Sequence, residues 1–148
     1  MIIRRALLEE IVDLRHRVLR AGLPRESAIF PADDGPTAIH VAAVEADEVV
    51  GCATLHLNEW QGKPAWQLRG MAVTPSHQRS GVGAKLLIAM ETAAGESDVH
   101  ELWCNARTPA AKFYERNGWQ IVSEPFDIPS AGPHVKMIKT ISQYNPSL

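Results

Sequence analysis

The sequence predicts an α/β or α+β fold in which helices cover a mixed β-sheet. Short runs rich in β-branched residues alternate with longer segments in which apolar residues recur at helical spacing. Their order along the chain is strand, helix, three strands, helix, strand, helix and two strands. Strand–helix–strand crossovers in the second half favour parallel neighbours, whereas tight turns favour antiparallel ones. We therefore expect one sheet of about seven strands.

The first half of the chain supplies four of these strands and one helix. Residues 1–5 are a short first strand, and the helix that follows ends before Gly22 and Pro24. Residues 25–36 mix Pro, Asp and Gly and are expected to form a loop with room for one helical turn. The runs 38–46 and 49–57 form a hairpin, and 65–73 is the next strand. The apolar residues of the first helix are Leu7, Ile11, Leu14, Val18 and Leu19.

The second half begins where the apolar period changes after Pro75. A helix is predicted from Ser80 to Gly95, with an apolar face made of Val82, Leu86, Met90 and Ala93 or Ala94. Residues 99–106 form a strand, and 109–118 form a short helix with Pro near its start and Gly at its end. The runs 119–128 and 134–141 are predicted to close the chain as two strands.

Composition limits the classes of protein that need consideration. The chain has 148 residues and 16.3 kDa, which fits one domain over 1–148. Its net charge of -2 gives no attraction for nucleic acid or an anionic membrane. The N-terminus lacks the uninterrupted apolar stretch of a signal peptide, so we expect a cytoplasmic protein. Cys52 and Cys104 lie in apolar strands and are expected to be buried thiols. An apolar sheet edge leaves a homodimer open.

The segment "HQRSGVGAKLL" (77–87) places Gly81 and Gly83 where a helix begins, at a cost in stability. Free N–H groups at a helix start can hold a phosphate if no side chain blocks them. A Walker loop does not fit, because no glycine lies five positions before Gly83. A dinucleotide fingerprint would need a small residue where Leu86 stands. The spacing of Gln78, Gly81 and Gly83 remains as a third type of phosphate-binding turn.

Together with "LRGMAV" before it and "LWCNARTPAAKFYERNGW" after it, this turn resembles the acetyl-CoA-binding half of the GNAT superfamily of N-acyltransferases. The resemblance is greatest to small bacterial members of the ElaA or YjcF type, and it covers residues 68–126. It implies a GNAT-like fold, a twisted, mostly antiparallel sheet with a parallel, splayed strand pair at the cofactor site. It also implies acetyl transfer from acetyl-CoA to a primary amine of a small molecule or peptide, by direct attack in a ternary complex. The rival hypothesis is a CoA-binding module without turnover.

The resemblance assigns roles to the turn and to the strand before it. Backbone amides of the turn would hold the diphosphate of CoA, and Gln78 would shape the turn. Met71 and Val73, with Ala72 between them, would offer amides to the thioester carbonyl and the pantetheine arm. Asn105 would hydrogen-bond the pantetheine. The amides assigned to the diphosphate are those of Arg79, Ser80, Gly81, Val82, Gly83 and Ala84.

For catalysis, Tyr114 matches the general acid of the family, and a phenol with a pKa near 10 suits a thiolate of similar basicity. The base is less clear, because Gln67 stands where some members carry Glu, and an amide cannot accept the proton. His134 is favoured because the final hairpin usually borders the acceptor site. No metal is expected, since the six histidines are not paired at ligand spacing. The other candidates for the base are His40, His56, Glu45, Glu59 or a chain of water molecules.

The acceptor itself is not identified by any motif. The first helix, the 25–36 loop and the final hairpin are expected to build its pocket. Charges of both signs occur there, and they come from Arg15, Arg17, Arg25, Asp33 and Asp34.

Overall fold

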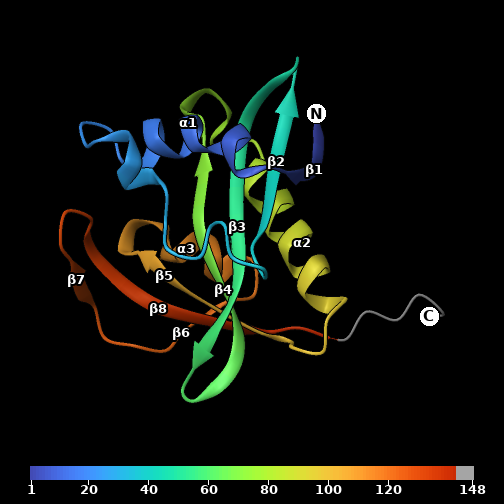
Figure 1. Ribbon diagram of the computed structural model, residues 1–148. Coiled ribbons are helices and arrows are strands. Elements are labelled where there is room, and N and C mark those ends of the chain that lie inside the picture. Colours follow the sequence, from blue (N-terminus) through green and yellow to red (C-terminus); the bar gives the residue numbers. More distant parts are fainter. Residues whose placement is uncertain (143–148) are drawn as a thin grey trace.

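The computed structural model describes residues 1–142 and contains an eight-stranded sheet with three α-helices (Figure 1). The domain predicted over 1–148 extends beyond these described residues. The helices are α1 (Leu8–Leu19), α2 (Val82–Gly95) and α3 (Ala111–Arg116). The strands are β1 (Ile2–Ala6), β2 (Ile39–Glu45), β3 (Glu48–Trp60), β4 (Lys63–Val73), β5 (Glu101–Arg107), β6 (Gln120–Ile121), β7 (Phe126–Ile128) and β8 (Gly132–Thr140).

The strand order confirms the predicted mixed sheet. Along the sheet the order is β1-β2-β3-β4-β5-β8-β6, and β7 also pairs with β8. Among the described strands β4 and β5 pair in parallel, and every other pair is antiparallel. The sheet ends on short strands, because β1 has five residues and β6 has two. Within residues 1–142, no helix combines the length and apolarity needed to cross a lipid bilayer.

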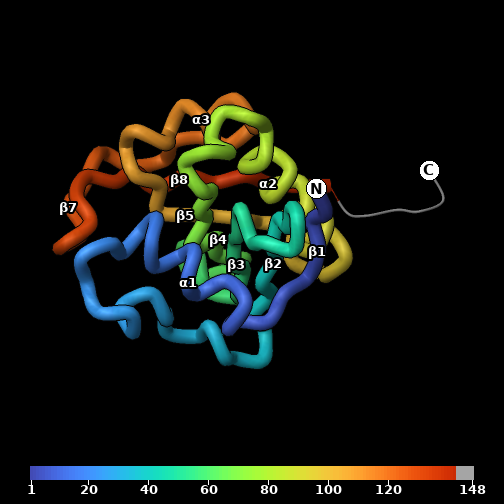
Figure 2. Tube along the Cα trace, turned by 90° about the horizontal axis from the view of Figure 1, so that it is seen from above, coloured from blue at the N-terminus to red at the C-terminus, as the bar shows by residue number. Residues whose placement is uncertain are grey.

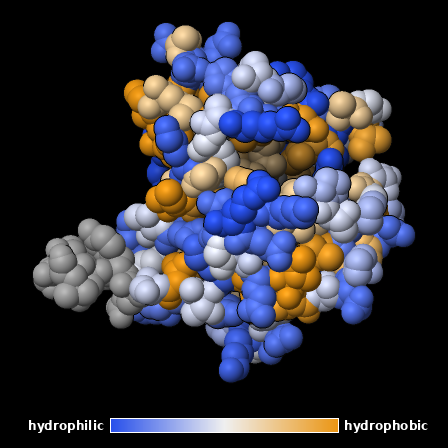
Figure 3. Space-filling view, turned by 180° about the vertical axis from the view of Figure 1, so that it is seen from behind, coloured by the Kyte–Doolittle hydropathy of each residue, from blue (hydrophilic) through white to orange (hydrophobic). Residues whose placement is uncertain are grey.

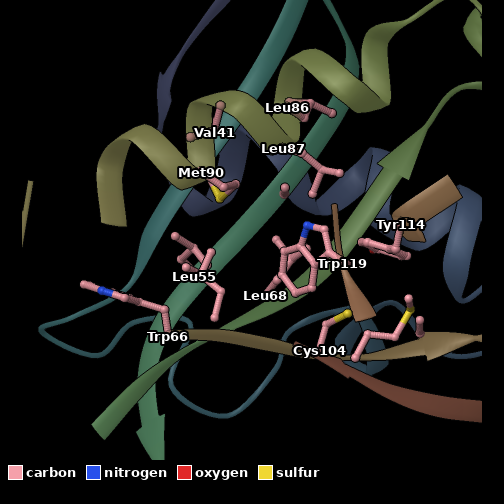
Figure 4. Close-up of a cluster of buried hydrophobic side chains, with 14 of the residues drawn as sticks. Val41, Leu55, Trp66, Leu68, Leu86, Leu87, Met90, Cys104, Tyr114 and Trp119 are labelled. Carbon is pink, nitrogen blue, oxygen red and sulfur yellow. The ribbon is translucent and has the colours of Figure 1, made fainter. Parts of the chain in front are cut away.

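The helices lie in two layers around the sheet. Seen from above, α1 lies on one side of the sheet, and α2 and α3 lie on the other (Figure 2). The main core forms under α2, where Leu86, Leu87 and Met90 pack with Leu55 and Leu68 of the sheet (Figure 4). This packing is the reason that the apolar face predicted for the second long helix is buried.

A smaller core forms under α1. Ile11 and Leu14 pack there against Cys52 and Ala72 of the sheet. Leu7 differs from the prediction, because it is the residue that precedes the first turn of α1 and is 61% exposed. Both cysteines are buried free thiols, as expected.

The strand predicted over 119–128 is wrong as a single element and is instead divided into β6 and β7. After β6, the Val122 N–H donates to the Lys136 carbonyl at 2.9 Å, and the Ser123 hydroxyl then accepts the Lys136 N–H at 2.8 Å. A side chain thereby replaces the backbone partner. Pro125 follows and has no N–H to continue the ladder. The sheet therefore has eight strands rather than about seven.

Candidate active site

The candidate site lies where β4 and β5 separate. Their parallel register covers only residues 66–68 of β4 and 102–104 of β5, although β4 continues to Val73 and β5 to Arg107. On its other edge, β4 shifts register against β3 between Cys52 and Thr54, and Gly70 there has a φ of +64°. An irregularity of this kind bends a strand. The two strands thus diverge toward their C-terminal ends.

A cleft of about 290 Å³ opens at this divergence. Figure 3 shows a hollow with hydrophobic residues at its floor and hydrophilic residues at its rim, and the lining of the cleft has the same mixed character. Of the predicted site residues, Met71, Asn105, Tyr114 and His134 all line the cleft, although they come from β4, β5, α3 and β8. The remaining members of the lining include Leu19, Arg20, Phe30, Gln67, Arg69, Cys104, Arg107, Phe113 and Ile128.

The β4 backbone offers donors to the opening. The Thr74 N–H donates to the Val50 carbonyl of β3 at 2.8 Å. Because successive N–H groups of a strand point in opposite directions, those of Val73 and Met71 point toward β5. The same alternation turns the Ala72 N–H toward β3. Of the three strand residues predicted to hold the cofactor, Ala72 is therefore the one turned away from the opening.

The glycine turn precedes α2, and its shape is fixed by residues on both sides. The Gln78 side-chain amide donates to the Val73 carbonyl at 2.9 Å, and the Ser80 hydroxyl donates to the His77 carbonyl. Arg79 has a φ of +65°, and Gly81 has a φ of +88° at the residue that precedes α2. Gln78 thus links the turn to the end of β4, in the position predicted for a shaping residue.

The two glycines of the turn are needed for different reasons. A Cβ on Gly81 would have no atom within 4 Å, so open space lies in front of it and only its φ favours glycine. A Cβ on Gly83 would lie 2.9 Å from Cζ of Phe113, which lines the cleft. The other residues of the turn share no single environment: Arg79 and Ser80 are exposed, Ala84 is half-buried, and Val82 points into the core.

Tyr114 lies on the cleft wall at the start of the apolar core. Its ring packs edge-on against Phe113 and Trp119, with centroids 5.2 and 5.5 Å away. Burial raises the pKa of Tyr114 well above its usual value, and the neighbouring Cys104 adds to this effect. The phenol therefore stays protonated at neutral pH, as a proton donor must. Across the cleft, Oδ1 of Asn105 accepts from Nζ of Lys136 at 3.0 Å.

Among the candidate bases, His134 is the one that lines the cleft. Its Nδ1 lies 2.8 Å from the Gly132 carbonyl, which can only accept a hydrogen bond. Nδ1–H is therefore the donor, and the neutral ring carries its free lone pair on Nε2. Gln67 also lines the cleft, and its side-chain carbonyl accepts from the Asn58 amide at 2.9 Å.

The other candidate bases lie elsewhere. His40 uses both ring nitrogens in a buried network with Thr54 and Asp33. His56 is buried and does not line the cleft, and Nε2 of its ring has no partner. Burial lowers the His56 pKa, and the nearby charge of Arg69 acts in the same direction. Glu45 pairs with His77 near the glycine turn, and this hydrogen bond lowers the Glu45 pKa. Glu59 is exposed near the end of β3.

Sequence reasoning missed three arginines of the cleft, Arg20, Arg69 and Arg107. The guanidinium groups of Arg20 and Arg107 meet at one acceptor, since both donate to the Leu19 carbonyl, at 3.1 and 3.2 Å. That of Arg69 lies 4.6 Å from the ring centroid of Phe30. A charged residue in the middle of an otherwise apolar strand was the one signal available, and it applied only to Arg69.

Comparison with known proteins agrees with this geometry. The sequence matches the acetyltransferase (GNAT) family over residues 7–119, and the chain belongs to that family. It is 31% identical over 140 residues to the uncharacterized N-acetyltransferase YitI of Bacillus subtilis (strain 168), covering 90% of this chain and 92% of YitI. For YjcF of the same organism, another uncharacterized N-acetyltransferase, the identity is 29% over 100 residues, covering 68% of this chain and 69% of YjcF.

The fold is shared with solved structures as well. The crystal structure of an aminoglycoside 6'-N-acetyltransferase complexed with coenzyme A superposes with a TM-score of 0.78 at 20% identity, covering 98% of this chain and 100% of that one. The resemblance to small bacterial GNAT members, and the mixed α/β fold that it implied, are therefore confirmed.

Proposed function

We propose that the chain transfers an acetyl group from acetyl-CoA to the primary amine of a small, negatively charged molecule. The observation that carries this proposal is the composition of the cleft at the β4–β5 divergence. Backbone donors of β4, the protonated phenol of Tyr114 and three arginines all border this one space. Acetyl transfer needs the first two, and the arginines indicate the acceptor.

The residues present fit a CoA ester. The start of α2 provides N–H groups without helical partners, and the space in front of Gly81 is open. The amides from Arg79 to Ala84 would hold the diphosphate there. The diverging strands leave room for an extended pantetheine arm, and Asn105 faces that room. When bound, the ester would supply the acetyl group as a thioester.

Residues of this chain can meet each chemical requirement of the transfer. The Met71 and Val73 N–H groups would donate to the carbonyl oxygen as negative charge develops on it. As the amine nitrogen forms its bond to the carbonyl carbon and the carbon–sulfur bond breaks, the Tyr114 hydroxyl would give its proton to the departing sulfur. Nε2 of His134, or water, would take the proton that the amine loses.

Direct attack by the amine is favoured over an acetylated enzyme. A covalent intermediate on cysteine would need a thiolate. Cys104 is the cysteine that lines the cleft, and burial raises the pKa of its thiol to about 12. Cys52 lies in the core under α1, where burial raises its pKa to about 11. Both thiols therefore stay protonated at neutral pH.

The charge of the cleft indicates the acceptor class. Among the described residues that line it, none is Asp or Glu. Arg20 and Arg69 form no ion pair with any carboxylate of residues 1–142. Burial lowers the pKa of both. The positive charges of Arg107 and Arg15 add to this effect at Arg20, whereas at Arg69 the charge of Asp33 opposes the lowering and those of Arg15 and Arg20 add to it. Unpaired like charges repel each other, and a carboxylate or phosphate placed among them would remove that repulsion.

The same charges disfavour a polycation. A polyamine or an aminoglycoside would bring further positive charge into a cleft whose described lining residues include no Asp or Glu. The aminoglycoside activity named for the structural neighbour is therefore not the activity we propose here. An amine that carries a carboxylate or phosphate, such as an amino acid or an aminoalkyl phosphate, fits the cleft better.

The test is a free-thiol assay with acetyl-CoA and matched pairs of acceptors. Each pair differs only in charge, for example an amino acid with its amide, and phosphoethanolamine with ethanolamine. We expect kcat/KM to be at least about tenfold higher for the anionic member of a pair. Equal rates within every pair, or a preference for spermidine or kanamycin, would contradict the acceptor class.

Two substitutions separate the chemical step from binding of the acceptor. Tyr114→Phe should lower kcat by about 10²-fold or more while CoA binding, measured by calorimetry, stays unchanged. Arg20→Gln should raise KM for the anionic amine and leave KM for acetyl-CoA unchanged. Arg17→Gln is the matched control, because Arg17 is exposed on the same helix. If wild type and Tyr114→Phe bind CoA but release thiol equally slowly with all acceptors, the chain is a CoA-binding module.

A further inference from the structure

The buried guanidinium of Arg15 contacts both the loop after α1 and the sheet. Arg15 of α1 is 0% exposed, although its neighbours on the helix face solvent on one side. It donates to the Ala28 carbonyl at 2.8 Å, to Oδ2 of Asp33 at 2.6 Å and to Oγ1 of Thr54 at 2.8 Å. Ala28 and Asp33 belong to the loop after α1, and Thr54 belongs to β3. Arg15 therefore joins three separate segments of the chain.

A closed set of hydrogen bonds fixes this loop against the sheet. Nε2 of His40 lies 2.9 Å from the Asp33 carbonyl, which can only accept, so Nε2–H is the donor. Nδ1 of His40 then accepts from the Thr54 hydroxyl at 2.8 Å. Thr54 in turn accepts from Arg15, and Arg15 binds the Asp33 carboxylate. Each of the four side chains has a partner in this buried set, although Nε of Arg15 has none, and the shared partners hold the loop against the sheet.

The same ion pair places the ring of Phe30. The Asp33 carboxylate accepts the Phe30 N–H at 2.6 Å, and Cζ of Arg15 lies 4.2 Å from the ring centroid. The guanidinium groups of Arg69 and Arg20 lie 4.6 and 5.2 Å from that centroid. Cations are attracted to the face of an aromatic ring. The ring thus holds two of the three cleft arginines, Arg20 and Arg69, and Arg15 with Asp33 holds the ring.

Arg15 also sets the shape of β4. A Cβ on Gly70 would lie 2.7 Å from Nε of Arg15, so the guanidinium fills the space beneath the bend in this strand. Gly70 stands between Arg69, which lines the acceptor side, and Met71, which offers its amide to the thioester. One buried side chain therefore touches both the segment that carries the acceptor charge and the segment that carries the backbone donors.

Stability alone is a weak reason for this arrangement. A buried ion pair loses the hydration of two charges, and a well-packed apolar pair of the same volume is often as stable. We propose that Arg15 and Asp33 are positioning residues, whose buried ion pair sets the affinity for the acceptor by holding Phe30, and with it Arg20 and Arg69, at a fixed place relative to Met71. This inference rests on the proposed function and adds two residues that touch neither substrate.

The first test is steady-state kinetics of Asp33→Asn, below the temperature at which the variant begins to unfold. We expect KM for the anionic amine to rise at least about tenfold, because small displacements of positioned groups are costly, and KM for acetyl-CoA to stay within about twofold. The preference for an anionic amine over its neutral amide should shrink by the same factor. A lower melting temperature with both KM values unchanged would show a merely structural ion pair and overturn the proposal.

A pair of variants at Phe30 keeps the test decisive if Asp33→Asn does not fold. Phe30→Leu leaves the ion pair intact and removes the aromatic face, so it should raise KM for the anionic amine. Phe30→Tyr keeps the ring and should retain the wild-type value. Equal KM values for wild type, Phe30→Leu and Phe30→Tyr would overturn the proposal, since the ring would then not hold the cleft arginines.

A binding measurement separates this inference from the proposed function. Inorganic phosphate is titrated calorimetrically into wild type, Phe30→Leu and Arg20→Gln, with CoA present to fill the glycine turn. The phosphate site that Arg20→Gln removes should be at least about fivefold weaker in Phe30→Leu. That result supports the positioning role even if no amine is acetylated, in which case the proposed function fails alone. A phosphate site lost in Arg20→Gln but unchanged in Phe30→Leu would overturn the inference.

Discussion

The two sides of the cleft are built by different means. On the side of α2 and α3, the core is apolar, and the groups that face the opening are backbone amides and one phenol. On the side of α1, a smaller apolar core lies beside a buried ion pair, a hydrogen-bonded histidine and several guanidinium groups. Backbone donors depend on strand and turn geometry, whereas side-chain charges depend on exact partners.

This difference has a consequence for how each side tolerates change. The α2 side should be sensitive to glycine substitutions that alter the backbone and tolerant of changes to the exposed side chains of the turn, such as those of Arg79 and Ser80. The α1 side should be sensitive to any substitution that leaves one buried charge without its partner. Four sets of variants test this contrast, in order of decreasing effect.

Removing Arg15 should have the largest effect on stability. In Arg15→Met the Asp33 carboxylate stays buried without its cation, which costs about 3–5 kcal/mol in the free energy of unfolding. Urea denaturation measures the loss. The control is Arg25→Met, which breaks the exposed pair with Asp13 and should cost less than about 1 kcal/mol. Similar losses in both variants would remove the contrast between the two sides.

Gly81→Val should separate backbone strain from binding on the α2 side. Valine at a φ of +88° costs about 1–2 kcal/mol of stability, and CoA affinity should fall about tenfold or more because the turn changes shape. Gly62→Val is the matched control: Gly62 also has a positive φ, +80°, and nothing within 4 Å, but it lies in the β3–β4 hairpin turn. If both variants bind CoA equally well in calorimetry, the turn does not hold the diphosphate.

Gly83→Ala should show that this glycine serves packing. Alanine inside a helix is normally more stable than glycine by up to about 1 kcal/mol. Here the added carbon lies 2.9 Å from Phe113, so we expect a net loss of about 1 kcal/mol. In the Phe113→Leu background the same substitution should become neutral or favourable. A stabilising effect in the wild-type background, by thermal denaturation, would contradict the contact.

The smallest effect concerns His56 on the α1 side of the sheet. Burial lowers its folded pKa below the ordinary value of 6.5, so at acid pH the unfolded chain binds this proton more readily than the folded chain. Its contribution should be fully present above pH 6.5 and lost as pH falls toward the lower folded value. The fall in stability between pH 7.5 and 5.5 should therefore be smaller in His56→Gln; an identical fall would refute the assignment.

The α2 side was also the side that the sequence predicted best. Its information is local, because the Gln78–Gly83 spacing, the following helical period and the aromatic pair at residues 113 and 114 each occupy a short stretch. The divided strand at residues 120–128 was missed because a serine hydroxyl, rather than a change in hydrophobic pattern, interrupts the ladder. Leu7 was assigned to the first helix because its period fits, although it precedes the first helical turn.

The α1 side could not be predicted in the same way. Arg20, Arg69 and Arg107 come from three separate elements and meet only because α1 lies across the sheet. Charges of both signs were expected near the acceptor, but nothing in the sequence shows that Asp33 is paired with Arg15, or that the described residues lining the cleft include no Asp or Glu. Such a net charge is a property of the folded arrangement.

The short outer strands of the sheet also affect how readily the protein aggregates. Edge strands have unpaired backbone groups, so strands of other chains can pair with them and start an aggregate. Here one edge strand is five residues long and carries Arg4 and Arg5, and the other is two residues long. Short, charged edge strands are poor templates for pairing with another chain, so this sheet is protected against growth into fibres.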